Sequence, residues 1–302
     1  MNPSEALVCI GVFDGVHRGH SALLTAARDA AVERGVRAAA IVLDPPPIEL
    51  LQTGHRVARL CPLDETIRRV VELGIDATVV NFTPAIRDLD PGDFLAALRP
   101  SVEVRGVVMT RLSAFGRDRS GTPTHLRDHG FEVIEVEPNV ADGAVISSSR
   151  IRAEIAAGRV AEAGRLLGHS PAVWGAVVHG DGRGRDLGYP TANLAFSYIP
   201  ALPKIGIYLG TAGTVESGLL PALVSVGRRP TFGSDGDVLV EAHLLDWSED
   251  LYGQEVTVTV AERLRDEVRF TSVEGLVSQM RRDEADARAR LKVWSEAEMG
   301  PV

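Results

Sequence analysis

The chain has 302 residues, of which 45% are hydrophobic and 24% are charged. This length and composition predict a globular protein with two domains of ordinary size. The net charge of −9 argues against non-specific nucleic-acid binding by the whole surface. No signal peptide and no membrane-length apolar run is found, so we expect a cytoplasmic protein without membrane contact. Cys9 and Cys61 have no metal-ligand spacing and are expected to be reduced, buried thiols.

The first half of the chain alternates strand-like and helix-like segments. The predicted strands are Leu7–Ile10, Ala38–Leu43, Ala77–Val80, Gly106–Met109 and Val133–Val136. The predicted helices are Ser21–Arg34, Leu63–Leu73, Pro91–Leu98 and Thr122–His129. Asp64 is a candidate cap of the second helix. Such alternation predicts an α/β domain with a parallel sheet, which binds ligands at the carboxyl ends of its strands.

The turn after the first strand, Gly11–His20, reads G-V-F-D-G-V-H-R-G-H. A glycine-rich turn between a strand and a helix offers backbone N–H groups to an anion. His17 and His20 stand three residues apart, so on a helix they share one face. Two imidazoles beside a phosphate cradle suit a reaction that transfers phosphorus and depends on positioning and charge. The alternative, an ordinary turn with two surface histidines, is disfavoured because strand, turn and helix fall where this chemistry needs them.

A second candidate anion site closes the first half. Ser147 and Ser148, followed by Arg150 and Arg152, run into a helix-like stretch over Ala153–Ala157. A second helical pattern, Val160–Leu167, would end at Gly168. A plain serine cap with solvated arginines is the alternative. His169–Pro171 is the expected link, which gives domains at residues 1–168 and 172–302.

From Trp174 onward the pattern changes to strands and turns, which predicts an antiparallel sheet or small barrel. The predicted strands are Gly175–Val178, Gly206–Thr211, Ala222–Val226, Val238–Leu245 and Gln254–Val260. The tail, Ser272–Met299, is helical, with Leu276, Met280, Ala287 and Leu291 on its apolar positions, and should pack along the barrel.

Two features of this second half point to chemistry. Gly180 and Gly184 let the backbone approach a ligand, and Arg185 offers a phosphate partner. Pro190 is followed by Thr191 and Asn193, whose side chains face the same way in an extended chain and suit Mg²⁺ bound with nucleotide phosphates. Farther on, Glu241 interrupts an apolar strand and would serve as a general base. A glycine-rich surface turn and the outward face of a barrel strand, with His243 as a polar neighbour, are the alternatives.

These motifs carry a resemblance to a known family over essentially the whole chain. Gly11–His20 resembles the G-x-F-D-x-x-H-x-G-H signature of nucleotidyltransferases. Gly175–Leu194, Ser225–Phe232, Val240–Asp246 and Asp250–Gly253 resemble, in that order, the riboflavin kinase domain. The chain is therefore similar to bacterial bifunctional riboflavin kinase/FMN adenylyltransferases (FAD synthetases). The resemblance implies a Rossmann-like N-terminal domain, a six-stranded C-terminal β-barrel with a C-terminal helix, and conversion of riboflavin to FMN and then FAD with ATP and Mg²⁺.

The resemblance also assigns roles to residues. His17 and His20 would stabilise adenylyl transfer, and Glu241 would take the proton of the riboflavin 5′-hydroxyl. Thr191 and Asn193 would hold Mg²⁺ and the ATP phosphates. The remaining nucleotide-binding candidates are Gly11, Phe13, Asp14, Gly19, Ser147, Ser148, Arg152, Gly180, Gly184, Arg185 and Pro190.

The first domain departs from the family pattern at two places. Family members carry T-F-x-P-H-P after the second strand, where Val42–Pro47 reads V-L-D-P-P-P without the histidine. They carry G-x-D/N-F-x-F-G after the fourth strand, where Met109–Gly116 keeps only the final Phe-Gly and adds Arg111, Arg117 and Arg119 nearby. The kinase half departs less, with Gly227–Phe232 reading G-R-R-P-T-F and adding Arg228.

These departures leave several alternatives open. The chain would make FMN and FAD, or act as a kinase only, or accept an altered flavin or nucleotide. A flavin-binding regulator with vestigial sites is a further class, against which the presence of Glu241, Thr191, Asn193, His17 and His20 weighs. Oligomeric state is not indicated by the sequence.

Overall fold

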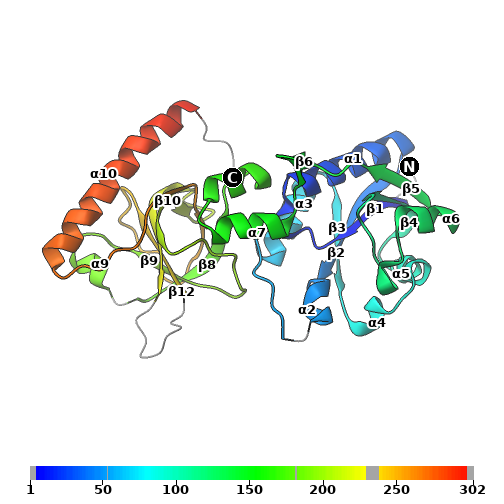
Figure 1. The fold of residues 1–302 in the computed structure, drawn as a ribbon, viewed down its shortest axis with the longest axis horizontal. Helices are drawn as coiled ribbons and strands as arrows, with labels where there is room; N and C mark the ends of the chain where they lie inside the picture. The colour runs from blue at the N-terminus through cyan, green and yellow to red at the C-terminus, as the bar shows by residue number, and fades with distance from the viewer. Residues whose placement is uncertain (1–4, 53, 181, 229–237, 298–302) are drawn as a thin grey trace. The chain divides into compact units, whose positions relative to one another are not determined.

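A computed structural model of the chain describes residues 5–52, 54–180, 182–228 and 238–297 (Figure 1). Its contacts divide the chain into two compact units, Met1–Ser148 and Ser149–Val302. This division assigns residues 149–168 to the second unit, while the expected boundaries at residues 168 and 172 remain a prediction. Residues 229–232 of the kinase-like motif lie outside the described residues.

The first unit is built on a parallel five-stranded sheet with the order β3-β2-β1-β4-β5. Its strands are β1 (Glu5–Gly11), β2 (Arg37–Asp44), β3 (Asp76–Asn81), β4 (Glu103–Thr110) and β5 (Glu132–Val136). Each of the five predicted strands of this half is present. The direction in which strands are added reverses between β1 and β4, which is where α/β sheets of this kind bind ligands.

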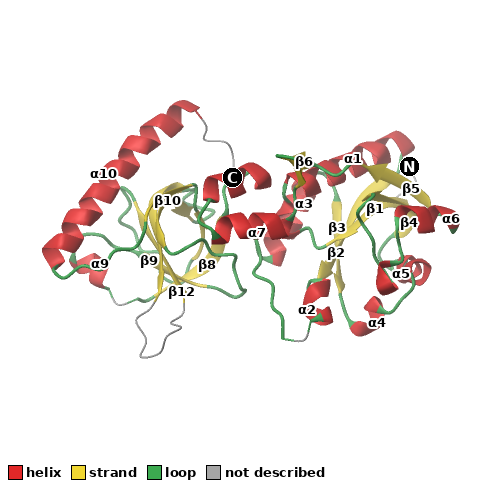
Figure 2. Cartoon of the chain, viewed as in Figure 1, coloured by secondary structure: helices red, strands yellow, loops and turns green. Residues whose placement is uncertain are grey.

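Helices cover both faces of this sheet, as the alternation predicts (Figure 2). On one face Leu7 and Cys9 pack against α1 and α3, and on the other Ala6 and Val8 pack against α5 and α6. The helices are α1 (Arg18–Arg34), α2 (Pro47–Leu51), α3 (Leu63–Glu72), α4 (Pro84–Arg87), α5 (Pro91–Ala97) and α6 (Pro123–Asp128). Two 3-10 turns, η1 (Asp14–Val16) and η2 (Arg117–Arg119), and a hairpin of β6 (Val140–Ala141) and β7 (Ala144–Val145) complete the unit.

One detail of α3 differs from the prediction. Asp64 does not cap this helix, because the capping position belongs to Pro62 and Asp64 lies within the first turn. A carboxylate there still interacts favourably with the positive end of the helix dipole. Both cysteines are buried and free, as expected.

The second unit contains a closed antiparallel barrel. Six strands follow the order β11-β12-β9-β8-β13-β10, and pairing between β10 and β11 closes the ring. They are β8 (Ala172–Val178), β9 (Ala192–Ala195), β10 (Gly206–Gly213), β11 (Leu220–Arg228), β12 (Val238–Leu244) and β13 (Glu255–Thr259). The short β14 (Glu262–Arg265) pairs with the first part of β10. The six-stranded barrel expected from the resemblance is therefore confirmed.

The helices described after the first unit's sheet are α7 (Ser148–Ala156), which begins at the last residue of that unit, and α8 (Val160–Leu167), α9 (Arg183–Asp186) and α10 (Val273–Ala297) of the second unit. Gly168 ends α8 in a left-handed conformation, with φ of 91°, as predicted. The predicted C-terminal helix is α10, whose buried Ala287 packs with Leu209, Leu223 and Leu245 on the outside of the barrel. Among the described residues, no helix is long and apolar enough to cross a membrane.

Strand alternation separates an inner barrel face from an outer one. Val224 on β11 and Val240 and Ala242 on β12 belong to the barrel core. Their neighbours Leu223, Ser225 and Glu241 therefore point outward. The outer face of β10, β11 and β12 is where the chemistry-bearing side chains of this unit gather.

Candidate active sites

The first candidate site is the turn that joins β1 to α1. Phe13 and Val16 adopt positive φ angles of 52° and 39°, which residues other than glycine rarely adopt. Gly15 between them has a φ of 76°. Strained backbone of this kind persists where the surrounding structure holds it, often at functional sites. Phe13 is buried, and its ring lies 3.3 Å from where a Cβ on Gly11 would stand. The turn is therefore a fixed cradle at the carboxyl end of β1.

His17 and His20 lie together at the start of α1. His17 caps the helix, and its Nδ1 accepts a hydrogen bond from the backbone N–H of His20 at 3.3 Å. The two rings stack with centroids 3.6 Å apart and planes 17° apart. A Cβ on Gly19 would lie 3.1 Å from the His17 ring, which explains the small residue between them. The predicted shared face is present.

The environment keeps His20 uncharged. Burial lowers the pKa of His20 well below its usual value, and the neighbouring His17 lowers it further. Because Nδ1 of His17 accepts a hydrogen bond from the chain, Nε2 is the ring nitrogen of His17 that can donate to a ligand. An imidazole N–H is suited to donate to a phosphate oxygen.

Asp14 has a structural position within the cradle. Its side chain is 4% exposed, and its Oδ1 accepts hydrogen bonds from the backbone N–H of Leu60 at 2.9 Å and of Cys61 at 3.5 Å. The Ser148 hydroxyl donates to the backbone carbonyl of Asp14 at 3.2 Å. The structure therefore brings the predicted serine element to the cradle, with Ser147 immediately before Ser148. Arg152 lies in the second unit, one turn after Ser148 on α7.

The two segments of the first unit that depart from the family pattern, Val42–Pro47 and Met109–Gly116, have defined structures. Asp44 ends β2 and forms an ion pair with Arg59, with 2.6 Å between Oδ1 and Nη2. The segment after β4 begins with Thr110, whose Oγ1 hydrogen-bonds to the Ser113 hydroxyl, and continues to the buried Phe115. Exposed Arg111 lies 3.8 Å from Glu137. Both segments are at the carboxyl ends of strands that neighbour the cradle.

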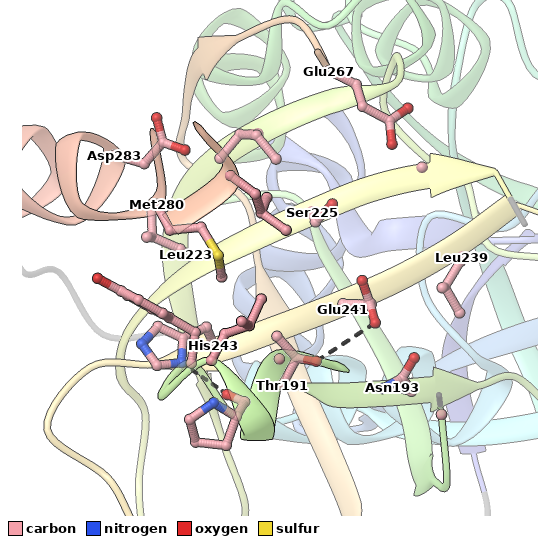
Figure 3. A pocket seen from close by; sticks show the side chains of 18 of the residues that line it. Thr191, Asn193, Leu223, Ser225, Leu239, Glu241, His243, Glu267, Met280 and Asp283 are labelled. Carbon is pink, nitrogen blue, oxygen red and sulfur yellow. Dashed lines mark hydrogen bonds between the residues drawn. The ribbon is translucent and has the colours of Figure 1, made fainter. Parts of the chain in front are cut away.

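The second candidate site is a cavity of about 450 Å³ on the outer face of the barrel (Figure 3). Strands β10, β11 and β12 form one wall through residues such as Ile207, Ser225 and Glu241. The C-terminal helix α10 contributes Leu276 and Met280, and the α9 segment contributes Gly184. A volume of this size is typical of pockets for small ligands.

Glu241 stands at the centre of this wall and points into the cavity (Figure 3). Strand pairing places it directly opposite Asn193 on β9 and opposite Ser225 on β11. The Thr191 hydroxyl donates to Glu241 Oε1 at 3.5 Å. The sequence left Glu241 as either a base or the outward face of a strand. The structure places it on the outward face, which lines the cavity, and its role as a base stays a prediction.

The glycine-rich segment approaches these residues closely. A Cβ on Gly180 would stand 2.5 Å from Asn193 Nδ2, and a Cβ on Gly184 would stand 2.3 Å from the Tyr189 carbonyl oxygen. A larger residue at position 184 would therefore clash with the backbone, and one at position 180 would displace the Asn193 side chain. His243 Nδ1 donates to the Pro190 carbonyl at 2.8 Å, which fixes the chain just before Thr191.

A ring stack lies beside the same segment. The Arg185 guanidinium lies 5.6 Å from the centroid of the Tyr252 ring, which packs on His179 with centroids 3.9 Å apart. Arg185 and Tyr252 both line the cavity. All of the kinase-half candidates named from the sequence, from Gly180 to Glu241, therefore meet at one cavity.

Sequence reasoning missed the residues that build the far wall. Arg265 on β14 donates from Nε and Nη2 to both carboxylate oxygens of Asp283 on α10, at 2.8 and 2.5 Å. Gln279 adds a hydrogen bond to Asp283 Oδ1 at 2.9 Å. In the sequence, only the spacing of the apolar residues Leu276 and Met280 indicated that one face of the tail helix packs against the barrel.

The oxygen atoms of Thr191, Asn193 and Glu241 form a hard donor set. Among the described residues, no group of three or more histidine, cysteine, aspartate or glutamate side chains could hold a metal ion. A cation here would thus depend on hydroxyl and amide oxygens together with oxygens of a bound ligand.

Comparisons with known proteins find relatives for both halves of the chain. A family model described as FAD synthetase matches residues 1–150, and one described as riboflavin kinase matches residues 167–291. The bifunctional riboflavin kinase/FMN adenylyltransferase of Listeria monocytogenes is 34% identical over 288 residues, covering 94% of this chain and 91% of that protein. The protein of the same name from Escherichia coli K12 is 35% identical over 293 residues, covering 95% and 93%.

A solved structure of a Streptococcus pneumoniae protein, described as a macrolide-efflux protein, has a TM-score of 0.87 and 32% identity and covers 95% of both chains. Both family models match, so these comparisons do not favour a kinase that has lost its first activity. The chain belongs to the bifunctional riboflavin kinase/FMN adenylyltransferase family.

Proposed function

We propose that this chain phosphorylates riboflavin to FMN in its second unit and adenylylates FMN to FAD in its first. The observation that carries the proposal is the cavity in which Glu241 faces Thr191 and Asn193 beneath the glycine-rich segment. The substrates are riboflavin, FMN and ATP.

In the kinase reaction, Glu241 acts as the general base. Its carboxylate accepts the proton of the riboflavin 5′-hydroxyl, whose oxygen forms a bond to the γ-phosphorus of ATP while the bond to the ADP oxygen breaks. The products are FMN and ADP. Gly180 and Gly184 let the backbone approach the phosphates, and Arg185 supplies a positive charge.

Mg²⁺ fits the oxygen donors at this site. We propose that Thr191 Oγ1 and Asn193 Oδ1 hold it together with ATP phosphate oxygens, since Mg²⁺ is commonly bound through a few protein oxygens and the substrate phosphates. When bound, the ion neutralises negative charge on the phosphates. The Thr191–Glu241 hydrogen bond orients the hydroxyl and the base relative to each other.

In the adenylyl transfer, His17 and His20 contact the phosphates of ATP. A phosphate oxygen of FMN forms a bond to the α-phosphorus, and the bond between the α- and β-phosphates breaks to release pyrophosphate. The imidazole N–H groups donate hydrogen bonds to the oxygens on which charge develops. Gly11, Phe13, Asp14 and Gly19 shape the cradle for this nucleotide.

The serine element completes the proposed ATP site. Ser147 and Ser148 at the start of α7 offer hydroxyl and backbone donors to the triphosphate, and Arg152 offers a cation. Support comes from the hydrogen bond that joins Ser148 to Asp14 of the cradle.

Product analysis tests the proposal. Purified full-length chain is incubated with ATP and Mg²⁺ and either riboflavin or FMN, and the flavins are separated by chromatography. We expect FMN and FAD from riboflavin, and FAD from FMN. FMN without FAD would refute the proposed adenylyl transfer, and no FMN from riboflavin would refute the proposed kinase.

A further inference from the structure

A small cavity of about 160 Å³ lies at the point where the order of the parallel sheet reverses. It is lined by Ile10 at the end of β1 and by Val107 and Met109 on β4. The segment after β4 adds Phe115 and Arg119. Ile10 directly precedes Gly11, so this cavity borders the nucleotide cradle along the chain. The location is where an α/β sheet receives a ligand.

The backbone that presents Arg119 is tightly built. Asp118 and Arg119 both have positive φ angles, 53° and 56°, although neither is glycine. The Phe115–Gly121 bridge closes the loop, and a Cβ on Gly121 would stand only 2.8 Å from the Phe115 carbonyl oxygen. Two consecutive residues other than glycine in the left-handed region are uncommon, and strained backbone of this kind clusters at functional sites.

Hydrogen bonds hold this strained conformation in place. The backbone N–H of Arg119 donates to Gly116, and that of Ser120 donates to Arg117, both at 3.0 Å. The Ser120 hydroxyl also donates to the Arg117 carbonyl at 2.8 Å. The backbone from which the Arg119 side chain extends is thus fixed before any ligand arrives.

The positive charge of Arg119 is available to bind a ligand. Among the residues that the structure describes, no carboxylate lies within ion-pair distance of its guanidinium, whereas Arg111 has Glu137 at 3.8 Å. A hydrogen bond from Arg87 lowers the pKa of Asp88 and one from the Asp93 backbone lowers that of Asp90, and the charge of Arg117 adds to both effects. Arg119 is therefore the arginine of this segment that combines an unpaired charge with a place at the cavity.

We propose that Arg119 binds the flavin ring of the FMN acceptor and determines its affinity in the first unit. The apolar strand ends receive an edge of the ring, and the planar guanidinium stacks on the ring or donates to its carbonyl oxygens. The phosphate of the same molecule then extends toward His17 and His20. This inference rests on the proposed adenylyl transfer, and it assigns a specificity role to a segment that departs from the family pattern.

Steady-state kinetics of the full chain test this role. Arg119→Ala and Arg119→Gly both remove the guanidinium, and glycine also relieves the positive φ, so it is the variant that keeps the loop unstrained. FAD formation is measured with FMN varied at saturating ATP, and then with ATP varied. Arg117→Ala is the matched control, since it removes an exposed arginine of the same loop that does not line the cavity.

The expected result is a rise of about 10-fold or more in the KM for FMN in both Arg119 variants, from the loss of a charge-assisted contact. The KM for ATP and the kinase activity should stay within two-fold, and Arg117→Ala should resemble the wild type. Lumiflavin, which has the ring without the ribityl phosphate, should inhibit the wild type competitively with FMN and lose potency in Arg119→Gly by a similar factor.

Several results would overturn the inference. An unchanged KM for FMN, or a rise in the KM for ATP instead, would remove Arg119 from the acceptor site while leaving the proposed function intact. Lumiflavin inhibition that is absent in the wild type, or unaffected by the substitution, would contradict a contact with the ring. A wild-type protein that makes no FAD would refute the adenylyl transfer itself, and this inference with it.

Discussion

The pair of Arg265 and Asp283 offers the sharpest test of how the kinase cavity is built. It joins β14 to α10 through two hydrogen bonds at 2.8 and 2.5 Å. The Asp283 side chain is 8% exposed and that of Arg265 is 21% exposed. Arg265→Met removes the cation and leaves the carboxylate buried with Gln279 as its remaining side-chain donor.

The expected loss of stability follows from this burial. Breaking a buried ion pair by removing one partner costs about 3–5 kcal/mol, because an uncompensated charge stays behind. The partial exposure of Arg265 and the hydrogen bond from Gln279 place the value near the lower limit, about 3 kcal/mol. For a unit of this size that corresponds to a fall of roughly 6–12 °C in the Tm of the second unit.

Tryptophan fluorescence during urea unfolding measures this loss. All three tryptophans of the chain, Trp174, Trp247 and Trp294, belong to the second unit, so the signal follows that unit alone. The KM for riboflavin, measured in the same preparations, should rise, since Leu276 and Met280 on α10 line the cavity that the pair helps to close.

An exposed ion pair that also involves α10 is the matched control. Arg288 makes a two-pronged contact with Asp246 at 2.8 and 2.7 Å, but the two side chains are 41% and 75% exposed. Arg288→Met should cost no more than about 1 kcal/mol. A similar loss in both variants, or a loss below 1 kcal/mol for Arg265→Met, would refute the argument from burial.

Other features give predictions of their own. His17→Ala should slow FAD formation from FMN by roughly 100-fold or more while FMN formation from riboflavin is unchanged; an unchanged FAD rate would remove His17 from the site. Burial raises the pKa of Cys9 to about 12 and of Cys61 to about 11, so a thiol reagent at pH 8 should label neither until the protein is unfolded, and rapid native labelling would contradict this. Burial alone would raise the pKa of Glu65, but hydrogen bonds from Arg68 and nearby positive charge lower it overall. The stability contributed by this carboxylate is therefore present above pH 4.5 and lost as the pH falls below that value. Glu65→Gln should flatten the acid side of the stability curve, and an identical acid side would contradict the assignment.

Much of the fold was predictable because hydrophobic period and turn chemistry agree along the chain. The five parallel strands are short apolar runs between helical patterns, and Gly168 marks the end of α8 as its position suggests. The segments that were missed are short. β14 has four residues, three of them charged, and α9 is a single turn within a glycine-rich stretch. Such segments form because neighbouring strands and loops pair with them. A local sequence pattern does not reveal this pairing.

The candidate sites were likewise predictable only in part. Motifs predicted which residues of the kinase half share a cavity, from Thr191 to Glu241, because strand pairing brings them into line. The Asp14 contact with Leu60 joins residues 46 positions apart, and the Arg265–Asp283 wall joins β14 to the tail helix. Both depend on tertiary packing. Arg119 stood out from the sequence as a departure, but its strained loop and cavity are visible only in three dimensions.

The most direct test of the central claim, two activities held by separate sites in one chain, is product analysis of the Glu241→Gln variant. The glutamine keeps the shape of the side chain but does not accept the proton of the riboflavin hydroxyl. With ATP and Mg²⁺, we expect this variant to form no FMN from riboflavin and to convert supplied FMN to FAD at the wild-type rate. Full kinase activity, or loss of both reactions in a folded protein, would contradict the account.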